Sequence, residues 1–579
     1  MKKWAKYIRP YMLYFILGPL GMIVEVVGEV VMPRLLAIII NNANAGTLTA
    51  STSLGVMGLM ILTAVLMMAG GVAGAYFGTK ASVNFAADVR RDVYSKVQSF
   101  SFANIDKFST GSLVTRLTND VTQVQNIVNM GLRMALRAPG MMIAALIMAI
   151  TLRPKLSTIF AVSMPVLLLA VGFIIRRGHP LFQAMQGKVD GLNATVQENV
   201  TNVRVVKSFV REDYEIEKFG NANRNLKMAG MKAVKNMIMM QPIMTIIMNA
   251  TVIAVILLGG PIVVRGDMEV GHLSAFITYV TQILSSLMMV TFMLMMSSRA
   301  LASAKRIQEV LQEEPDISDS DAKYRDLKVT KGAVEFKDVT FRYYKTSEES
   351  VLEKINLSIP AGATVGIIGS TGCGKTTLVS LIPRLYDTDE GAVFVDGVNV
   401  RNYTMENLRD GVGMVLQRNT LFSGSIAENL RWGDENASDE EMKRAAEHAQ
   451  AAKFIESFKE GYDTMIDQGG TNVSGGQRQR LCIARALLRK PKILILDDST
   501  SAVDTATEAQ IRKAFREDLK DSTKIIIAQR ISSVQEADMI VVMDDGKITG
   551  VGTHDELLAN NEEYREIYDS QMEMKKKEG

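Results

Sequence analysis

The chain has 579 residues, of which 47% are hydrophobic and 22% are charged, and its formal net charge is +3. This length is too great for one hydrophobic core, so two or more domains are expected. The small net charge argues against a nucleic-acid partner. Both cysteines, Cys373 and Cys482, lie in the polar second half without a spaced disulfide framework, which is typical of a reducing cytosol.

The first half of the chain is rich in long apolar runs. A helix needs about 20 apolar residues to cross a hydrocarbon core of about 30 Å. Four charge-free runs meet this length, and two further segments meet it with a few charges inside. Together they predict six transmembrane helices, within residues 11–41, 54–79, 127–152, 156–175, 236–264 and 270–298.

Basic residues are distributed unevenly around these segments. Lysines and arginines precede the first segment and follow the second and the fourth. Because cytoplasmic loops carry the excess of Lys and Arg, we expect a multi-pass protein of the cell membrane with both termini in the cytoplasm. The two cytoplasmic connections continue as charged helices. Each contains a short segment suited to docking on another domain, at about 102–112 and 207–217.

Two acidic residues interrupt the first apolar segment. Glu25 and Glu29 are four positions apart and therefore share one helix face. Polar residues at membrane depth are candidates for function. The pair could lie in an interhelical cavity and bind Arg34 or the backbone, or it could contact a substrate or a proton. Methionine clusters at 237–244 and 288–296 could likewise fill gaps or form an adaptable binding surface.

A charged linker at 314–331 separates a membrane domain, 1–313, from a second domain, 332–579, in which strand and helix patterns alternate. A strand-like run there leads into GSTGCGKT, which matches the phosphate-loop pattern G-x-x-x-x-G-K-[ST]. Its glycines let backbone amides surround phosphate oxygens, Lys375 would reach the β- and γ-phosphates, and Thr376 would bind Mg²⁺. The candidate nucleotide-binding residues are Gly369, Ser370, Thr371, Gly372, Cys373, Gly374, Lys375, Thr376 and Thr377.

Two later motifs complete this picture. The apolar run before Asp497 predicts a buried strand, and Asp497 at its end would hold Mg²⁺ through water. The stretch NVSGGQRQRLCIARALL, 472–488, contains a Ser-Gly-Gly turn that opens an amphipathic helix. Such a turn is either a capped helix start or a second anion-binding array of amides. One nucleotide needs only one array, so a second one is informative.

The order of these motifs resembles that of an ATP-binding cassette (ABC) exporter half-transporter over essentially the whole chain. The resemblance implies a membrane α-helical domain of six transmembrane helices fused to an α/β P-loop nucleotide-binding domain, with ATP and Mg²⁺ as ligands. It implies that Tyr343, or less readily Tyr344, stacks on adenine, although a plain strand tyrosine is an alternative. It also implies that Gln417 contacts Mg²⁺ and the attacking water.

The resemblance further implies a partner. Six helices are half of the family's complement of twelve, so a second half-transporter is expected from another chain. The turn at 474–477 resembles the family signature, which contacts the γ-phosphate of ATP bound to the opposite subunit; its residues are Ser474, Gly475, Gly476 and Gln477. The sequence SAVD, 501–504, resembles the loop that crosses between the two sites, and the docking segments resemble coupling helices.

Two positions depart from the family pattern. Asp498 stands where a glutamate usually polarises the attacking water, and Gln529 stands where a switch histidine is usual. A carboxylate shortened by one methylene retracts by about 1.5 Å. A general base acts within hydrogen-bond distance, about 2.6–3.2 Å, so this retraction removes direct contact with the attacking water. Glutamine can donate to the γ-phosphate but cannot become a cation.

These departures predict a degenerate, slow ATP site within a heterodimeric, multidrug-type exporter of amphipathic small molecules, lipids or peptides. This chain would then give its signature to the competent site of the partner. Three alternatives stay open. They are a homodimeric exporter in which Asp498 acts through a water, an exporter-fold importer of a metal chelate, and a channel-like subunit that ATP gates.

Overall fold

The computed structural model describes residues 4–344, 347, 349–498 and 505–578. Its contacts divide the chain into two compact units, which we call the helical unit, Met1–Gln98 with Gly111–Gln312, and the α/β unit, Ser99–Thr110 with Glu313–Gly579. The segment Ser99–Thr110 thus belongs by its contacts to the α/β unit, although the helical unit precedes and follows it in sequence. The domain boundaries at 313 and 331 stay a prediction.

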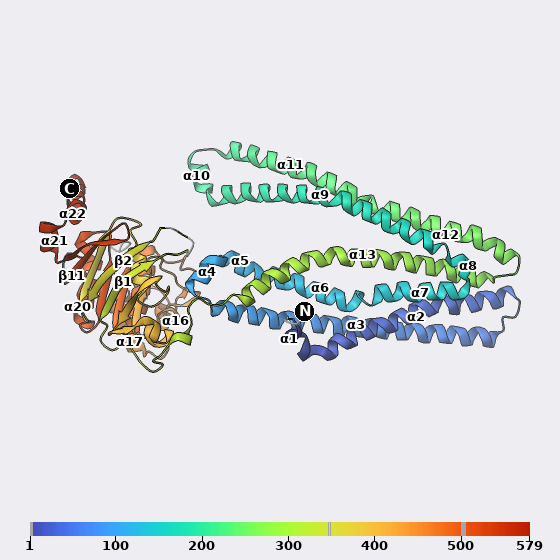
Figure 1. Ribbon diagram of the computed structural model, residues 1–579, viewed down its shortest axis with the longest axis horizontal. Helices are drawn as coiled ribbons and strands as arrows, with labels where there is room; N and C mark the ends of the chain where they lie inside the picture. The colour runs from blue at the N-terminus through green and yellow to red at the C-terminus, as the bar shows by residue number, and fades with distance from the viewer. Residues whose placement is uncertain (1–3, 345–346, 348, 499–504, 579) are drawn as a thin grey trace. The chain divides into compact units, whose positions relative to one another are not determined.

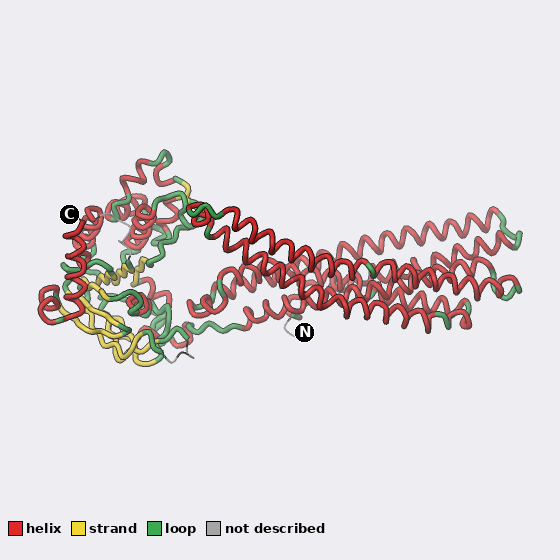
Figure 2. The backbone as a smooth tube through the Cα atoms, turned by 90° about the horizontal axis from the view of Figure 1, so that it is seen from above, coloured by secondary structure: helices red, strands yellow, loops and turns green. Residues whose placement is uncertain are grey.

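The helical unit consists almost entirely of helix (Figures 1 and 2). Its long helices are α2 (Met12–Asn44), α3 (Ala50–Gln98), α6 (Val121–Met134), α7 (Arg137–Leu152), α9 (Phe160–Thr201), α11 (Glu212–Ile238), α12 (Met240–Val264) and α13 (Val270–Gln312). Shorter pieces are α1 (Ala5–Ile8), α5 (Thr110–Thr115), α8 (Pro154–Ser157) and α10 (Val203–Ser208), and a π-helical turn, Arg116–Asp120, leads into α6.

Among the described residues, five helical stretches are long and apolar enough to cross a membrane. They are Ala50–Gln98, Thr110–Leu152, Pro154–Thr201, Glu212–Val264 and Val270–Met293. These stretches contain four of the six predicted segments and residues 270–293 of a fifth, 270–298. The remaining segment, 11–41, lies in α2, which is 33 residues long but carries charges inside its apolar sequence.

The acidic residues of α2 are paired with a helix other than their own. Arg137 of α7 has Nη2 3.0 Å from Oε1 of Glu25 and 3.4 Å from Oε2 of Glu29. The cation that pairs with these acids is therefore Arg137 rather than Arg34, which was one of the partners suggested by the sequence, because the helix face that carries both acids turns toward α7. An ion pair across helices lets α2 keep two carboxylates at membrane depth.

Helices α2 and α3 pack closely through glycines. A Cβ atom on Gly21 would lie 2.6 Å from the Gly70 carbonyl oxygen and 2.7 Å from the Gly74 nitrogen. Small residues are the usual means by which membrane helices approach each other, since lipid supplies little hydrophobic drive for their association. A larger side chain at Gly21 would force the two helices apart.

The α/β unit contains two main sheets. The six-stranded sheet has the order β12 (Lys547–Gly552), β11 (Met539–Asp544), β3 (Thr364–Gly369), β10 (Thr523–Ile527), β9 (Ile493–Asp497), β6 (Val412–Val415), and all its pairings are parallel except that of β12 with β11. The antiparallel sheet has the order β2 (Leu352–Ile359), β1 (Val334–Phe341), β4 (Glu390–Val395), β5 (Val398–Asn399). Every residue of β9 and β10 is buried, as is usual for central parallel strands.

Helices and a small hairpin complete the α/β unit. The hairpin pairs β7 (Gly424–Ser425) with β8 (Met465–Ile466). The helices are α4 (Phe102–Phe108), α14 (Lys375–Ser380), α15 (Met405–Asp410), α16 (Ile426–Arg431), α17 (Asp439–His448), α18 (Ala452–Ser457), α19 (Gly475–Leu488), α20 (Thr505–Asp518), α21 (His554–Asn560) and α22 (Glu562–Glu578). One apolar core joins the two sheets with α14, and a second contains α16, α17 and α19.

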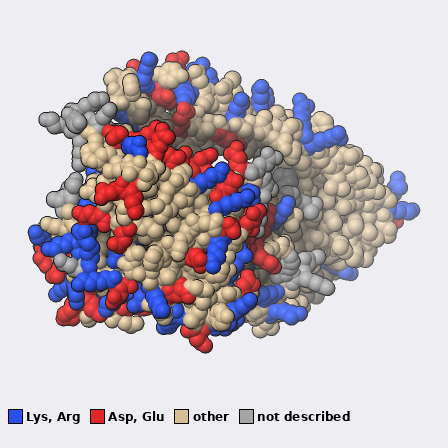
Figure 3. Space-filling view, turned by 60° about the vertical axis from the view of Figure 1, so that its left-hand side comes forward, with Lys and Arg blue, Asp and Glu red and all other residues tan. Residues whose placement is uncertain are grey.

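Acidic and basic side chains are interspersed on the face of the molecule shown in Figure 3. Within the α/β unit, several acidic and basic side chains form ion pairs. Arg489 lies 2.7 Å from Asp410, and Lys490 lies 2.6 Å from Glu441. Such exposed pairs each add at most about 1 kcal/mol to stability, so the fold of this unit depends chiefly on its two apolar cores.

Candidate nucleotide site

The phosphate-loop sequence forms a tight turn between β3 and α14. Gly372 and Gly374 have φ of +90° and +95°, in the left-handed region that favours glycine. Lys375 opens α14, and its Nζ donates to the carbonyl oxygens of Gly369, at 2.8 Å, and Ser370, at 2.6 Å. The ammonium group therefore lies over the loop, where it and the N-terminal amides of α14 can receive an anion.

Asp497 ends β9 beside this loop. Strands β3 and β9 both flank β10 in the parallel sheet, so their carboxyl ends lie at the same edge. Thr376 Oγ1 donates to Asp497 Oδ1 at 2.9 Å. The other carboxylate oxygen, Oδ2, is buried and has no hydrogen-bond partner among the described residues. Burial raises the pKa of Asp497, and the neighbouring Asp498 charge raises it further.

The two departures from the family pattern contact each other directly. Gln529 Nε2 donates to Asp498 Oδ2 at 2.7 Å, and the side chain of Gln417 also hydrogen-bonds Asp498. Burial raises the pKa of the Asp498 carboxyl, while the two amides act in the opposite direction. Asp498 itself has φ +46°, a left-handed conformation that Asp adopts more readily than most residues.

The aromatic candidate lies beside the phosphate-loop helix. The hydroxyl of Tyr343 is 2.9 Å from Thr377 Oγ1, and its side chain is 42% exposed. Tyr344 is 71% exposed, so of the two tyrosines Tyr343 has the closer tie to the loop. The ring of Tyr343 lies nearly perpendicular to those of Tyr386 and Phe341, with centroids 5.2 and 5.1 Å apart.

Tyr386 is a residue that sequence reasoning missed. Its hydroxyl donates to Asp106 Oδ2 of α4 at 3.0 Å, and its ring lies 6.0 Å from that of Phe102. The first docking segment is therefore connected to Tyr343 through one intervening ring. The only sequence signal was an aromatic residue shortly after the phosphate-loop helix, which by itself indicates no contact with residue 106.

The signature turn is well formed but lies elsewhere in the unit. Ser474 Oγ accepts from the Gln477 backbone N at 3.2 Å, and Gln477 Oε1 accepts from the Ser474 backbone N at 2.9 Å, which is a capping box. Ser474 and Gly475 are exposed, and α19 packs in the second core. No hydrogen bond between described residues joins 474–477 to 369–377. The loop at 501–504 lies outside the described residues.

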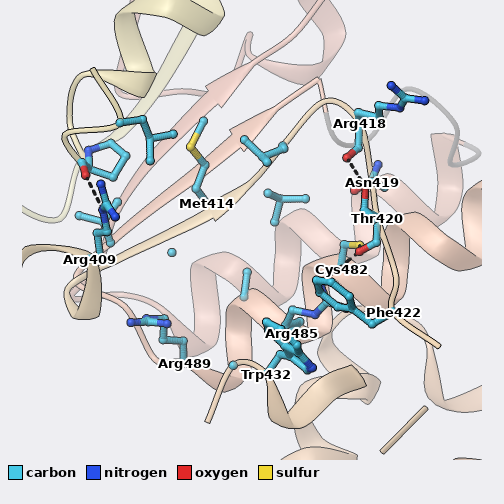
Figure 4. A pocket seen from close by; sticks show the side chains of 18 of the residues that line it. Arg409, Met414, Arg418, Asn419, Thr420, Phe422, Trp432, Cys482, Arg485 and Arg489 are labelled. Atoms are coloured by element: carbon cyan, nitrogen blue, oxygen red, sulfur yellow. Dashed lines mark hydrogen bonds between the residues drawn. The ribbon is translucent and has the colours of Figure 1, made fainter. Parts of the chain in front are cut away.

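A groove of about 410 Å³ lies on the α/β unit, and its lining includes Leu416 and Arg418, the two neighbours of Gln417 in sequence (Figure 4). Phe422 and Trp432 stack at its base with centroids 4.1 Å apart. Arg485 donates to the Asn429 carbonyl oxygen at 2.9 Å, and burial lowers the pKa of its guanidinium. An apolar floor with fixed arginines suits the docking of a short protein segment.

Comparisons with known proteins match both halves of the chain. Residues 13–287 match the ABC transporter transmembrane region, and residues 352–501 match the ABC transporter family model. The chain is 38% identical over 573 residues to the uncharacterized ABC transporter ATP-binding protein YfiB of Bacillus subtilis, covering 99% of this chain and 98% of that protein. The chain belongs to the ABC transporter family. The match from residue 13 also includes α2, the helix with internal charges.

Two further matches concern the type of transporter. An ATP-dependent lipid A-core flippase of Desulfotalea psychrophila is 36% identical over 488 residues, 84% of each chain. A bacterial Atm1-family ABC exporter with ATP bound has the same fold, with a TM-score of 0.78 at 24% identity and 98% coverage of both chains. The expected fold is therefore confirmed. The chain is a half-transporter of the ABC exporter type, with one membrane region fused to one ATP-hydrolysing domain.

The contact between Tyr386 and Asp106 leads to a prediction about coupling. Tyr386→Phe keeps the ring contacts with Tyr343 and Phe102 but removes one hydrogen bond, which is worth about 1 kcal/mol. We expect ATP affinity to be unchanged and cargo-stimulated ATPase activity to fall by about fivefold. Nucleotide titration and ATPase assays with and without cargo measure the two effects. Tyr344→Phe serves as the matched control, and an equal loss of ATP affinity would contradict the prediction.

Proposed function

We propose that this chain is the slow-site subunit of a heterodimeric, ATP-driven ABC exporter. The observation that supports this most directly is the carboxylate of Asp498. It accepts hydrogen bonds from two amide side chains, Gln529 and Gln417. A shortened carboxylate already engaged by two amides is poorly placed to take a proton from an attacking water.

The ATP-binding parts of the site remain complete. The phosphate loop, Lys375 and Tyr343 would bind the triphosphate and the adenine. Asp497 Oδ2, which lacks a partner within the described chain, together with Thr376 and Gln417 forms an oxygen donor set that fits Mg²⁺. When bound, this ion would neutralise charge on the phosphate oxygens. The site would therefore hold ATP while turning it over slowly.

The exposure of the signature turn, 474–477, supports the presence of a second subunit. Ser474, Gly475 and Gly476 keep the geometry of a capped helix N-terminus, yet Ser474 and Gly475 are exposed, and no hydrogen bond between described residues joins the turn to its own phosphate loop. A head-to-tail arrangement of two nucleotide domains would place this turn against ATP on the partner. The partner would supply the glutamate and histidine that this chain lacks, so two copies of this chain alone would form two slow sites.

Docking segments would transmit ATP-driven closure to the membrane helices. The first, around α4, contacts Tyr386. The second, around α10, exposes Phe209 by 73% and Val210 by 81%, and such apolar side chains match the apolar floor of the groove beside Gln417. We place the nucleotide domains and both termini in the cytoplasm. An amphipathic cargo, whether drug-like, lipid or peptide, agrees with the lipid flippase among the relatives.

Transport in inverted membrane vesicles tests this function. The vesicles contain this chain together with a half-transporter that has glutamate after its magnesium aspartate and a switch histidine. We expect ATP-dependent accumulation of a fluorescent amphipathic dye, lost when the partner's glutamate is replaced by glutamine. Equal accumulation by vesicles that contain this chain alone, or flux that needs no continued hydrolysis, would contradict the proposal. Accumulation only in right-side-out vesicles would indicate import.

A further inference from the structure

A polar cavity of about 240 Å³ lies among α2, α7 and α13 of the helical unit. Its wall on α13 carries polar residues spaced three or four positions apart, so they share one face of that helix. They are Thr278, Thr281, Gln282, Ser285 and Ser286. Residues Val270–Met293 of α13 form one of the stretches that are apolar enough to cross a membrane. A row of polar side chains on such a helix is unusual and indicates a function.

The acids beside this cavity outnumber their cation. Glu25 and Glu29 share the single guanidinium of Arg137, at 3.0 and 3.4 Å. Among the described residues, neither Arg34 nor Arg133 forms an ion pair with either carboxylate. Gly71 of α3 lets Glu25 fit, because a Cβ atom there would lie 3.2 Å from Oε2. Two carboxylates facing one guanidinium leave an excess negative charge, which is costly at membrane depth unless a cation binds.

Three polar side chains of the wall, Thr278, Thr281 and Gln282, have oxygens that can accept hydrogen bonds from a ligand. Gln282 Nε2 donates to the Glu29 backbone oxygen at 3.0 Å, and its Oε1 is buried with no hydrogen-bond partner among the described residues. The hydroxyls of Thr278 and Thr281 donate to carbonyl oxygens of their own helix, at 3.2 and 3.3 Å, so their oxygens can still accept. A ligand that satisfies these three oxygens must bring hydrogen-bond donors.

We propose that this cavity binds the protonated amine of an amphipathic cargo, a proposal that rests on the transport function proposed above. Glu29 and Glu25 supply the counter-charge, and Gln282 Oε1 accepts an N–H of the ammonium group. An anionic head group is disfavoured because Arg137 is already shared by two carboxylates. Met141 and Met289 also line the cavity, and their flexible thioethers suit the adjoining apolar part of the cargo.

Binding of radiolabelled dodecylamine to the full chain tests this, with the chain assembled with its partner in lipid nanodiscs and ATP omitted. Dodecyltrimethylammonium keeps the charge without an N–H, and dodecanol has neither. We expect Glu29→Gln to weaken binding of both cations by about tenfold. Gln282→Leu should weaken dodecylamine alone, by about fivefold. Dodecanol should bind all variants alike, and Glu269→Gln, an acid outside the cavity, is the matched control.

Three outcomes would overturn the assignment. They are equal affinity for amine and alcohol, unchanged amine affinity in Glu29→Gln, and parallel loss of all three ligands. ATP binding by each variant reports correct folding. These binding measurements need no ATP hydrolysis, so they are independent of the transport assay. Intact amine binding without ATP-driven flux would count against the proposed function. Intact flux without amine binding would count against this cavity as the binding site.

Discussion

Gly475→Asp should reduce the ATPase activity of the assembled heterodimer by at least about 100-fold, although Gly475 lies outside this chain's own ATP site. The signature amides would bind the γ-phosphate at the competent site of the partner, and loss of one such donor costs about 10²–10³ in rate. The new carboxylate would also repel the phosphate. Steady-state ATPase assays on the purified complex measure the effect.

The control for this prediction is the substitution Asp498→Asn in the same complex. Because Asp498 belongs to the slow site, its replacement should change total turnover by less than about twofold. ATP binding by both variants should persist, since the phosphate loop and Lys375 are unaltered. Activity that survives Gly475→Asp but collapses in Asp498→Asn would reverse the assignment of the two sites.

The double variant Asp498→Glu with Gln529→His should raise turnover by this chain alone by about 100-fold, the lower end of the contribution of general acid–base groups. The added methylene extends the carboxylate by about 1.5 Å, and the substitution at Gln529 breaks the amide contact that now engages Asp498. Single-turnover assays with labelled ATP measure the rate.

A matched control separates the effect of side-chain length at residue 498 from the effect of a basic carboxylate there. Asp498→Gln with Gln529→His has the same side-chain lengths but no basic carboxylate, so its turnover should stay at the level of the unmodified chain. Equal activation of both double variants would show that the effect comes from packing around residue 498. No activation of the glutamate variant, with ATP binding intact, would show that these two positions do not limit the rate.

Local sequence was sufficient to predict which segments of the candidate ATP site lie side by side. The phosphate loop and Asp497 were predicted to lie together, and they do, because β3 and β9 both flank β10 at the carboxyl edge of a parallel sheet. The apolar runs also predicted the helical stretches that are long and apolar enough to cross a membrane, and α2 lies in the part of the chain that matches the ABC transporter transmembrane region. Each of these features depends on a pattern within one segment.

Features that depend on distant pairs could not be predicted in the same way. Arg137 pairs with acids more than a hundred positions away, whereas Arg34, one of the partners that the sequence suggested, is only the nearest cation in sequence. Tyr386 meets Asp106 across 280 positions, and no periodicity encodes that contact. The signature could be recognised but not placed against a ligand, since its proposed ligand is bound by another chain.

The central claim is that this polypeptide binds ATP without hydrolysing it efficiently by itself. The most direct test measures, on one preparation of the purified chain in lipid nanodiscs, the amount of bound ATP and the rate of phosphate release per bound nucleotide. We expect saturable ATP binding, lost in Lys375→Ala, with phosphate release close to background. Vigorous release by this chain alone, abolished by Asp498→Asn, would contradict the account and favour a homodimer that uses Asp498 through a water.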